Sequence, residues 1–148
     1  MVKINVLLFI IKRIMEINVA TICDAASVTD GKLSVLGAFD TIYVNSVPVL
    51  HPNCSLAFQV LLDGKDDEEH DFIVKIMDED GNEAIGDIAL KLVAKKNKAR
   101  KFEQINIALN IQNLKLEKLG YYKIELLENN EVIKTIHFLV QKTLPKEK

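Results

Sequence analysis

The sequence predicts an all-β protein, a single antiparallel β-sandwich of immunoglobulin-like or related Greek-key topology with about nine strands. Three observations predict this class. Apolar residues alternate with a period of two through most of the chain, turn-forming pairs such as Asp-Gly and Asn-Asn separate the alternating runs, and no segment of the 148 residues has a sustained helical period. Hydrophobic residues make up 49% and charged residues 27%, which fits one globular domain.

The N-terminal segment does not have the pattern of a membrane span. Its apolar run, residues 6–11, is far shorter than the about 20 residues that a spanning helix needs. Lys12 and Arg13 end this run before any signal-peptide cleavage site. "MEINVATICD" is a clean beginning for a strand, so we expect residues 1–14 to be an extension or upstream sequence before a possible true start at Met15. The sandwich domain is then residues 15–142, with a short charged tail at 143–148.

The first hairpin is expected in "CDAASVTDGKLSVLGAFD", residues 23–40. Asp30-Gly31 has the composition of a two-residue turn, which pairs Thr29 with Lys32 and, farther out, Cys23 with Ala38. This register gives the hairpin one apolar face, which we expect to lie in the core: Ile22, Ala26, Val28, Leu33, Val35 and Phe39.

Asp24 is the residue that this hairpin does not explain. It falls on the apolar face opposite Gly37, and glycine within a strand indicates a bulge or a bend. We expect such an irregularity at Gly37, with Asp24 accepting the backbone N–H groups that it frees. The alternative is a catalytic or metal-binding carboxylate.

The later strands follow the same alternation, and prolines interrupt it once. Pro48 and Pro52 predict a loop over 45–54 and exclude a central strand there. Leu116, Gly120 and Tyr122 have the spacing of a tyrosine corner, in which the tyrosine hydroxyl bonds back to nearby backbone. The predicted strands have their apolar residues at 56–62, 72–76, 105–111, 122–126 and 136–140.

Candidate metal and thiol chemistry is sparse. Two cysteines, Cys23 and Cys54, are too few for a disulfide scaffold, so we expect packed thiols rather than a bridge. With His51 they would supply at most three zinc ligands of the four that a structural site uses. Asp78 and Asp80 in loop 78–83 leave calcium open, although Ile76 breaks the EF-hand pattern and a hairpin turn explains the same residues.

Two charged loops are solvated tips or interaction patches. The acidic loop lies at 64–71, and the basic loop lies at 95–102. The net charge of −2 and the excess of lysine (17) over arginine (2) make nucleic acid an unlikely partner. The basic loop presents five cations that could meet a partner: Lys95, Lys96, Lys98, Arg100 and Lys101.

The residues favour a cytoplasmic, non-enzymatic binding or accessory module. It would act through loops or a sheet edge on an unknown protein partner or on a second copy, with no transmembrane segment, cofactor or metal. One alternative is a peripheral membrane or calcium-dependent module. Another is an unrecognised hydrolase that uses Asp24, Asp40 and His51.

Residues 20–52, "ATICDAASVTDGKLSVLGAFDTIYVNSVPVLHP", resemble the opening of a family of small uncharacterised prokaryotic proteins, a domain of unknown function. "IMDEDGNE" and "GYYKIELLENNEVIKTIHFLV" resemble the middle and last hairpins of that family, so the resemblance covers roughly residues 15–142. It implies a β-sandwich fold and supports Met15 as the start. It implies no chemistry.

Overall fold

The computed structural model describes residues 14–63, 68–95 and 99–146, and within these ranges the chain forms nine strands and no helix. The all-β class and the number of strands are confirmed. Residues 1–13 of the expected extension lie outside the described residues, and Ile14 already belongs to the first strand. The strands are β1 (Ile14–Thr29), β2 (Lys32–Ala38), β3 (Thr41–Val44), β4 (Val49–Asp63), β5 (Glu68–Asp78), β6 (Glu83–Ala94), β7 (Phe102–Leu116), β8 (Gly120–Glu128) and β9 (Glu131–Lys142).

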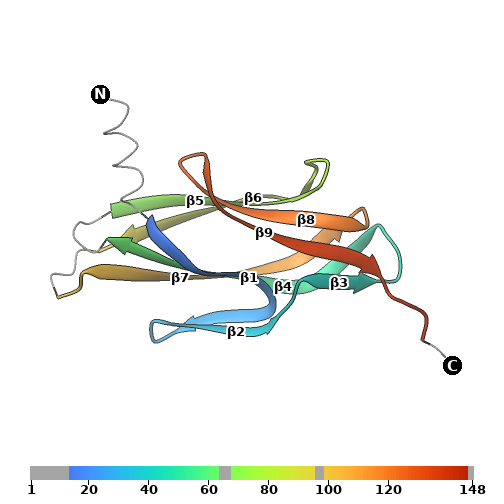
Figure 1. Ribbon diagram of the computed structural model, residues 1–148, viewed down its shortest axis with the longest axis horizontal. Helices are drawn as coiled ribbons and strands as arrows, with labels where there is room; N and C mark the ends of the chain where they lie inside the picture. Colours follow the sequence, from blue (N-terminus) through green and yellow to red (C-terminus); the bar gives the residue numbers. More distant parts are fainter. Residues whose placement is uncertain (1–13, 64–67, 96–98, 147–148) are drawn as a thin grey trace.

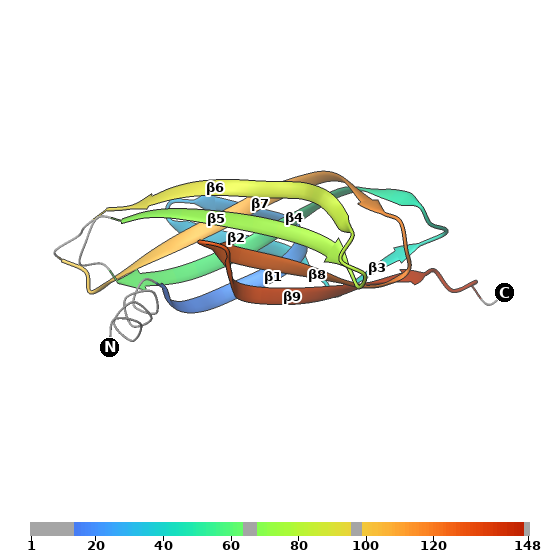
Figure 2. The same cartoon turned by 90° about the horizontal axis from the view of Figure 1, so that it is seen from above.

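The strands form two sheets that stack face to face (Figure 1). Sheet A has the order β2-β1-β4-β7, and sheet B has the order β3-β9-β8-β5-β6. The view in Figure 2 shows sheet B lying over sheet A. The β3 strand runs parallel to β9, with Thr41 opposite Leu139, so the prediction of a wholly antiparallel sandwich is wrong for this strand. The chain passes from sheet A to sheet B between β2 and β3, and it enters sheet B in the direction of β9.

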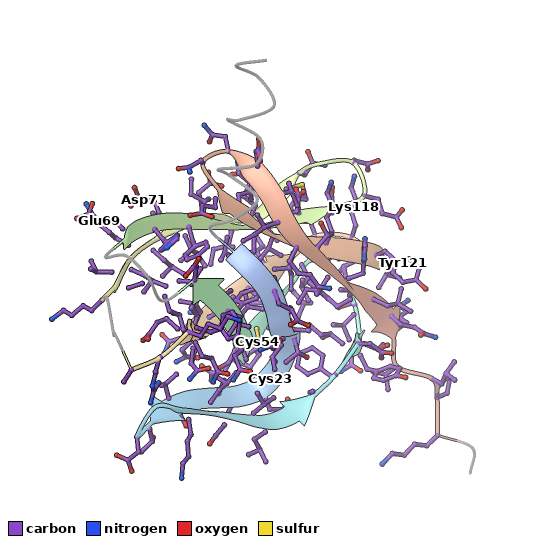
Figure 3. The ribbon with its side chains drawn as sticks, turned by 60° about the vertical axis from the view of Figure 1, so that its left-hand side comes forward. Cys23, Cys54, Glu69, Asp71, Lys118 and Tyr121 are labelled. Carbon is purple, nitrogen blue, oxygen red and sulfur yellow. The ribbon has the colours of Figure 1, made fainter. Side chains whose placement is uncertain are left out.

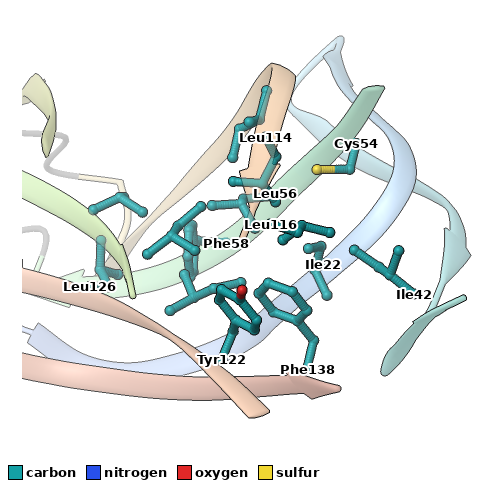
Figure 4. Close-up of a cluster of buried hydrophobic side chains, with 14 of the residues drawn as sticks. Ile22, Ile42, Cys54, Leu56, Phe58, Leu114, Leu116, Tyr122, Leu126 and Phe138 are labelled. Atoms are coloured by element: carbon teal, nitrogen blue, oxygen red, sulfur yellow. The ribbon is translucent and has the colours of Figure 1, made fainter. Parts of the chain in front are cut away.

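The core lies between the sheets and comes from alternate residues of facing strands (Figure 4). Leu56 and Phe58 of β4 are buried opposite Tyr122 of β8 and Phe138 of β9. The rings of Tyr122 and Phe138 stack with their centroids 5.1 Å apart. Each large apolar side chain buried in this way contributes about 1.5–3 kcal/mol. The alternation in the sequence thus identified the inward faces of these strands.

Strand β1 belongs to two layers. It pairs with β4 up to Cys23 and with β2 from Cys23 onward. Figure 1 shows the β1–β2 hairpin turned back beneath sheet A, and the amide of Asn106 in β7 donates a 2.9 Å hydrogen bond to the carbonyl of Gly31 at its tip. Ser55 and Ala57, next to the core-facing Leu56, are buried as well. Ser55 and Ala57 point to the face of β4 that lies away from sheet B. Their small side chains leave room for the hairpin on that face.

The hairpin has the register that the sequence predicts, from Thr29 opposite Lys32 to Cys23 opposite Ala38. Its turn has positive φ at Asp30 (51°) and Gly31 (70°), as a type I′ turn requires. The predicted core face is wrong beyond the bend. Ile22 and Phe39 contact the main core, but four residues of the hairpin do not belong to it: Ala26, Val28, Leu33 and Val35. The bend after Cys23 carries these residues away from the space between the sheets.

The loop expected at 45–54 is shorter than predicted, because β4 begins at Val49 and continues through Pro52. In the pairing of β4 with β7, Pro52 has no partner, because His51 pairs with Leu114 and Asn53 with Gln112. Asn113, across from Pro52, has a φ of 55°. The β1 strand pairs with β4 only from Ser55 onward, so Pro52 occupies a stretch that pairs on one side only. A proline is tolerated there because it removes no hydrogen bond from a second neighbour.

The tyrosine corner is confirmed. The hydroxyl of Tyr122 donates to the carbonyl of Lys118 at 2.9 Å and accepts from the N–H of the same residue at 3.2 Å. Gly120, between them, has a φ of 114°. These bonds fix the entry of the chain into β8.

Candidate functional site

A pocket of about 200 Å³ lies where β1 bends and the chain passes from β2 to β3. The described residues that line it are Asp24, Phe39, Thr41, Ile42, Tyr43 and His51. The structure therefore brings together Asp24 and His51, two of the three polar residues that the sequence singled out. The third, Asp40, does not line the pocket. Its carboxylate accepts a 2.9 Å hydrogen bond from the Thr41 hydroxyl, and its carbonyl accepts one from the Leu139 N–H.

Asp24 is exposed and its carboxylate lies over Gly37. Gly37 has a φ of 65°, which confirms the expected irregularity, while the register is the same on both sides of it. A Cβ at Gly37 would overlap the carboxylate and would stand 2.9 Å from Cγ of Asp24. The expected backbone hydrogen bonds to Asp24 are absent from the described part of the chain. The side chain is exposed to solvent where β1 bends.

His51 stands on β4 with its ring edge-on to Phe39, at 6.4 Å between centroids and 62° between planes. Its Nε2 is buried and has no hydrogen-bond partner among the residues that the structure describes. An unsatisfied buried polar atom costs about 1–3 kcal/mol. Packing alone holds this imidazole, and no hydrogen bond joins it to Asp24.

Cys23 and Cys54 are free and buried, as the sequence predicts (Figure 3). The Cys23 thiol lies 3.3 Å from the carbonyl of Ala25 and 3.5 Å from that of Ser55. Burial, followed by the charges of Cys23 and Asp24, raises the pKa of Cys54 to about 11. Burial and then Asp24 also raise the pKa of Cys23, against a smaller opposite effect of the bond to Ala25. Both thiols are therefore protonated at neutral pH and are poor nucleophiles or metal ligands.

The turn after β5 uses Asp78 for backbone bonding. One carboxylate oxygen accepts the N–H groups of Asp80 and Asn82, both at 2.9 Å, and the other accepts the side-chain amide of Asn82 at 3.2 Å. Burial acts to raise the pKa of Asp78, but these bonds and the nearby Lys118 outweigh it and leave the pKa lowered.

Lys118 supplies the cation at this turn. Its Nζ lies 2.6 Å from an Asp80 carboxylate oxygen and 4.0 Å from one of Asp78. Lys118 and Tyr121 lie on the same side of the molecule in Figure 3, and the Tyr121 N–H donates to Glu79. No group of three or more acidic, histidine or cysteine side chains suited to a metal occurs within the described ranges. The hydrogen bonds of Asp78 show that the predicted hairpin turn forms in loop 78–83.

The charged loops are described only in part. Lys95, Arg100 and Lys101 are exposed, and the Lys101 ammonium lies 5.5 Å from the Phe102 ring centroid. Lys96 and Lys98, and residues 64–67 of the acidic loop, lie outside the described residues. The remainder of the acidic loop, residues 68–71, belongs to β5.

A buried pair between His70 and Glu128 was not predicted from the sequence. Nδ1 of His70 lies 2.6 Å from a Glu128 carboxylate oxygen, and the imidazole stacks on Phe72 at 5.8 Å. The two residues are 58 positions apart and meet only because β5 and β8 are neighbours. Alternation on β5, which places His70 in phase with Phe72, was the only available signal. This pair belongs to the interior and does not line the pocket.

The nine strands in two stacked sheets define an all-β protein. The chain belongs to a family of unknown function (DUF6941), whose pattern residues 18–141 match. No curated protein matches it. Among the described residues, no helix is long and apolar enough to cross a membrane.

The solved structures that are similar to this chain include two at low identity. One is an alkylpurine DNA glycosylase from Pseudomonas fluorescens bound to DNA with an abasic site analog, with a TM-score of 0.47 and 14% identity over 82% of this chain. The other is a β-glucosidase from Listeria innocua, with a TM-score of 0.48 and 8% identity over 85% of this chain. The chain spans 30% of the glycosylase and 15% of the glucosidase.

Proposed function

We propose that the protein is a non-enzymatic binding module that receives an extended segment of a partner protein at the free edge of β2. One observation carries the proposal. The β2 strand is the outermost strand of sheet A and pairs with β1 alone among the described strands. An edge strand that keeps unpaired N–H and C=O groups can add a strand from another chain.

The register tells which groups of β2 are unpaired. In a two-residue hairpin the residues that flank the turn, Thr29 and Lys32, exchange both backbone hydrogen bonds. Ser34 and Leu36 bond to β1 in the same way, and the residues between them do not. The N–H and C=O groups of Leu33 and Val35 therefore point away from β1 and are available to a partner.

The side chains around this edge support the same function. Between Lys32 and Asp40 the chain carries no charge, although edge strands are commonly guarded by charged residues. Leu36 is 71% exposed and Val35 is 38% exposed. A shallow groove of about 340 Å³ follows the hairpin, and its described lining is apolar or small: Ala25, Ala26, Ser27, Ser34, Val35 and Leu36. By contrast, the β6 edge carries Asp87 and Lys91, each in an ion pair with β5.

The proposal includes an immunoglobulin-like arrangement in which loops and edges surround a fixed core. The order β1-β4-β7 in one sheet and β5-β8-β9 in the other supports it, because immunoglobulin-like domains place their A, B, E and C, F, G strands in this way. The tyrosine corner at the start of β8 supports it too. The β1–β2 hairpin is an addition to that scheme.

The proposal also includes the lack of catalysis and a cytoplasmic location. The absence of a hydrogen bond between Asp24 and His51, and the raised pKa values of both thiols, support a non-enzymatic role. Two buried free cysteines support a reducing compartment.

Selection of a phage-displayed library of random twelve-residue peptides on the native chain tests the proposal. We expect enriched peptides rich in β-branched residues, because these favour the extended conformation. Bound peptide should slow amide hydrogen exchange at Leu33 and Val35. Protection at Ala26 and Val28 in place of these two would contradict the assignment to β2.

Two substitutions at one position provide the matched control. Val35→Pro removes the outward N–H and leaves the β1–β2 hydrogen bonds intact, whereas Val35→Thr keeps the N–H and nearly the same shape. The proline variant should lose peptide binding at least tenfold, and the threonine variant should keep it. Equal binding by both variants, with both folded, would remove strand addition at β2.

A further inference from the structure

We propose that the pocket at the bend of β1 binds an organic cation, an ammonium or guanidinium group of the kind that lysine and arginine side chains carry. The pocket is the one of about 200 Å³ between the β1 bend, β3 and β4. This goes beyond strand addition at β2, because the pocket has its own geometry and needs no strand on the edge.

The charge of the pocket favours a cation. Among the described residues that line it, Asp24 is the only acid, and none is a lysine or an arginine. Ion pairs between described residues involve other acids, so the Asp24 carboxylate has no cation of its own in this part of the chain. Asp40 adds a second negative charge immediately after Phe39. A cationic donor would find a charge-assisted hydrogen bond at Asp24.

The walls of the pocket are aromatic. Phe39 and His51 meet edge to face at 6.4 Å, and Tyr43, on the short parallel strand β3, is 63% exposed. The faces of phenylalanine and tyrosine rings attract cations within about 6 Å of the ring centre. An acid beside two such rings favours a cation over a neutral ligand of the same size.

The Asp24 carboxylate has room at the pocket because residue 37 is a glycine. Gly37, at a φ of 65°, leaves the space that the carboxylate fills, and any Cβ there would collide with it. A larger residue at position 37 would have to displace the carboxylate from this place. Gly37 is therefore part of the pocket, although it supplies no side chain.

Titration of the full-length protein with blocked lysine, Nα-acetyl-lysine methylamide, tests the inference. The readout is the amide and ring NMR shifts of Thr41, Tyr43 and His51. We expect saturable shifts with blocked lysine and with the blocked arginine analogue. The neutral isostere, Nα-acetyl-norleucine methylamide, should bind at least tenfold more weakly. Equal shifts with the norleucine compound, or no saturation with either cation, would overturn the inference.

Two matched substitutions locate the charge. Asp24→Asn keeps the shape over Gly37 and should weaken binding of blocked lysine at least tenfold. Asp40→Asn removes the neighbouring charge and should change binding less than threefold, because Asp40 does not line the pocket and its carboxylate accepts the Thr41 hydroxyl. Binding that survives Asp24→Asn, in a variant with an unchanged NMR spectrum elsewhere, would overturn the assignment.

Butylammonium distinguishes a free amine from a protein side chain. Tighter binding of blocked lysine identifies a protein segment as the source, and equal binding identifies a free amine. Val35→Pro separates this site from the β2 edge. It should leave blocked lysine bound, and loss of that binding in the folded variant would contradict an independent pocket.

Discussion

The carboxylate of Asp24 fills the space in which a Cβ of residue 37 would stand. Gly37 has nothing larger than a hydrogen there, and its φ of 65° is one that other residues adopt only at a cost. These two residues face each other just beyond Cys23, where the pairing of β1 with β4 ends. The Asp24 side chain therefore restricts residue 37 to glycine, and a larger residue at position 37 would displace the Asp24 carboxylate.

Gly37→Ala should destabilise the protein by about 2–4 kcal/mol, from the left-handed backbone and from the collision with Asp24. Urea unfolding at neutral pH measures the loss. Gly31→Ala is the matched control, because Gly31 has a similar φ of 70° but no atom within 4 Å of the Cβ position. It should lose only about 1–2 kcal/mol. Equal losses in the two variants would show that Asp24 does not restrict position 37.

Tyr122→Phe should cost about 1–2 kcal/mol, because it removes the two hydrogen bonds between the hydroxyl and Lys118. Thermal or urea unfolding detects this loss. Tyr121→Phe, on the exposed neighbour, should change stability by less than about 0.5 kcal/mol. A Tyr122→Phe variant as stable as the native chain would mean that the corner does not stabilise the fold.

Acid should destabilise the native chain more than an Asp78→Asn variant. The pKa of Asp78 is lowered in the folded state, so its contribution is present above the ordinary value of 3.8 and is lost as the pH falls through the folded pKa. Urea midpoints measured from neutral pH down to about pH 2 compare the two proteins. Asp71→Asn, at an exposed acid outside the turn, should keep the native pH profile. An unchanged acid limb in Asp78→Asn would contradict the role of the turn.

Alkaline pH should destabilise the folded protein through ionisation of the Cys54 thiol. Its pKa is raised from 9.0 to about 11, so its contribution is complete below pH 9.0 and is lost as the pH rises toward 11. The loss amounts to about 2–3 kcal/mol. Cys54→Ala should remove the Cys54 part of this alkaline loss and leave the part that comes from Cys23, whose pKa is also raised. A coloured disulfide reagent at pH 8 should label neither cysteine in the native chain and both in urea, and rapid labelling without urea would contradict the burial.

The sequence predicted those parts of the fold that local chemistry determines. Asp30-Gly31 fixed the register of the first hairpin, and alternation identified Leu56, Phe58 and Tyr122 as core residues. Val28 and Val35 were assigned to the core because alternation reports which face a residue is on and not what covers that face. The parallel pairing of β3 has no local signal, since the two strands of the pair are almost 100 residues apart.

The candidate site was predicted in part. Asp24 was singled out because it broke the pattern of its strand, and His51 because histidine is chemically versatile; their shared pocket depends on the bend. Asp40 was grouped with them as a residue of the alternative hydrolase, but its carboxylate bonds to the Thr41 hydroxyl and does not line the pocket. Phe39 and Tyr43 were missed as site residues because apolar and aromatic positions in strands ordinarily indicate packing.

The shared strand β1 also protects the fold against misalignment. A slip of one residue against β4 would exchange Ile22 for Cys23 in the core, and a slip of two would bury Asp24 there. The Asp30-Gly31 turn specifies the other half of the same strand independently. Only one alignment satisfies both halves, so errors made while one half forms are rejected when the other half pairs.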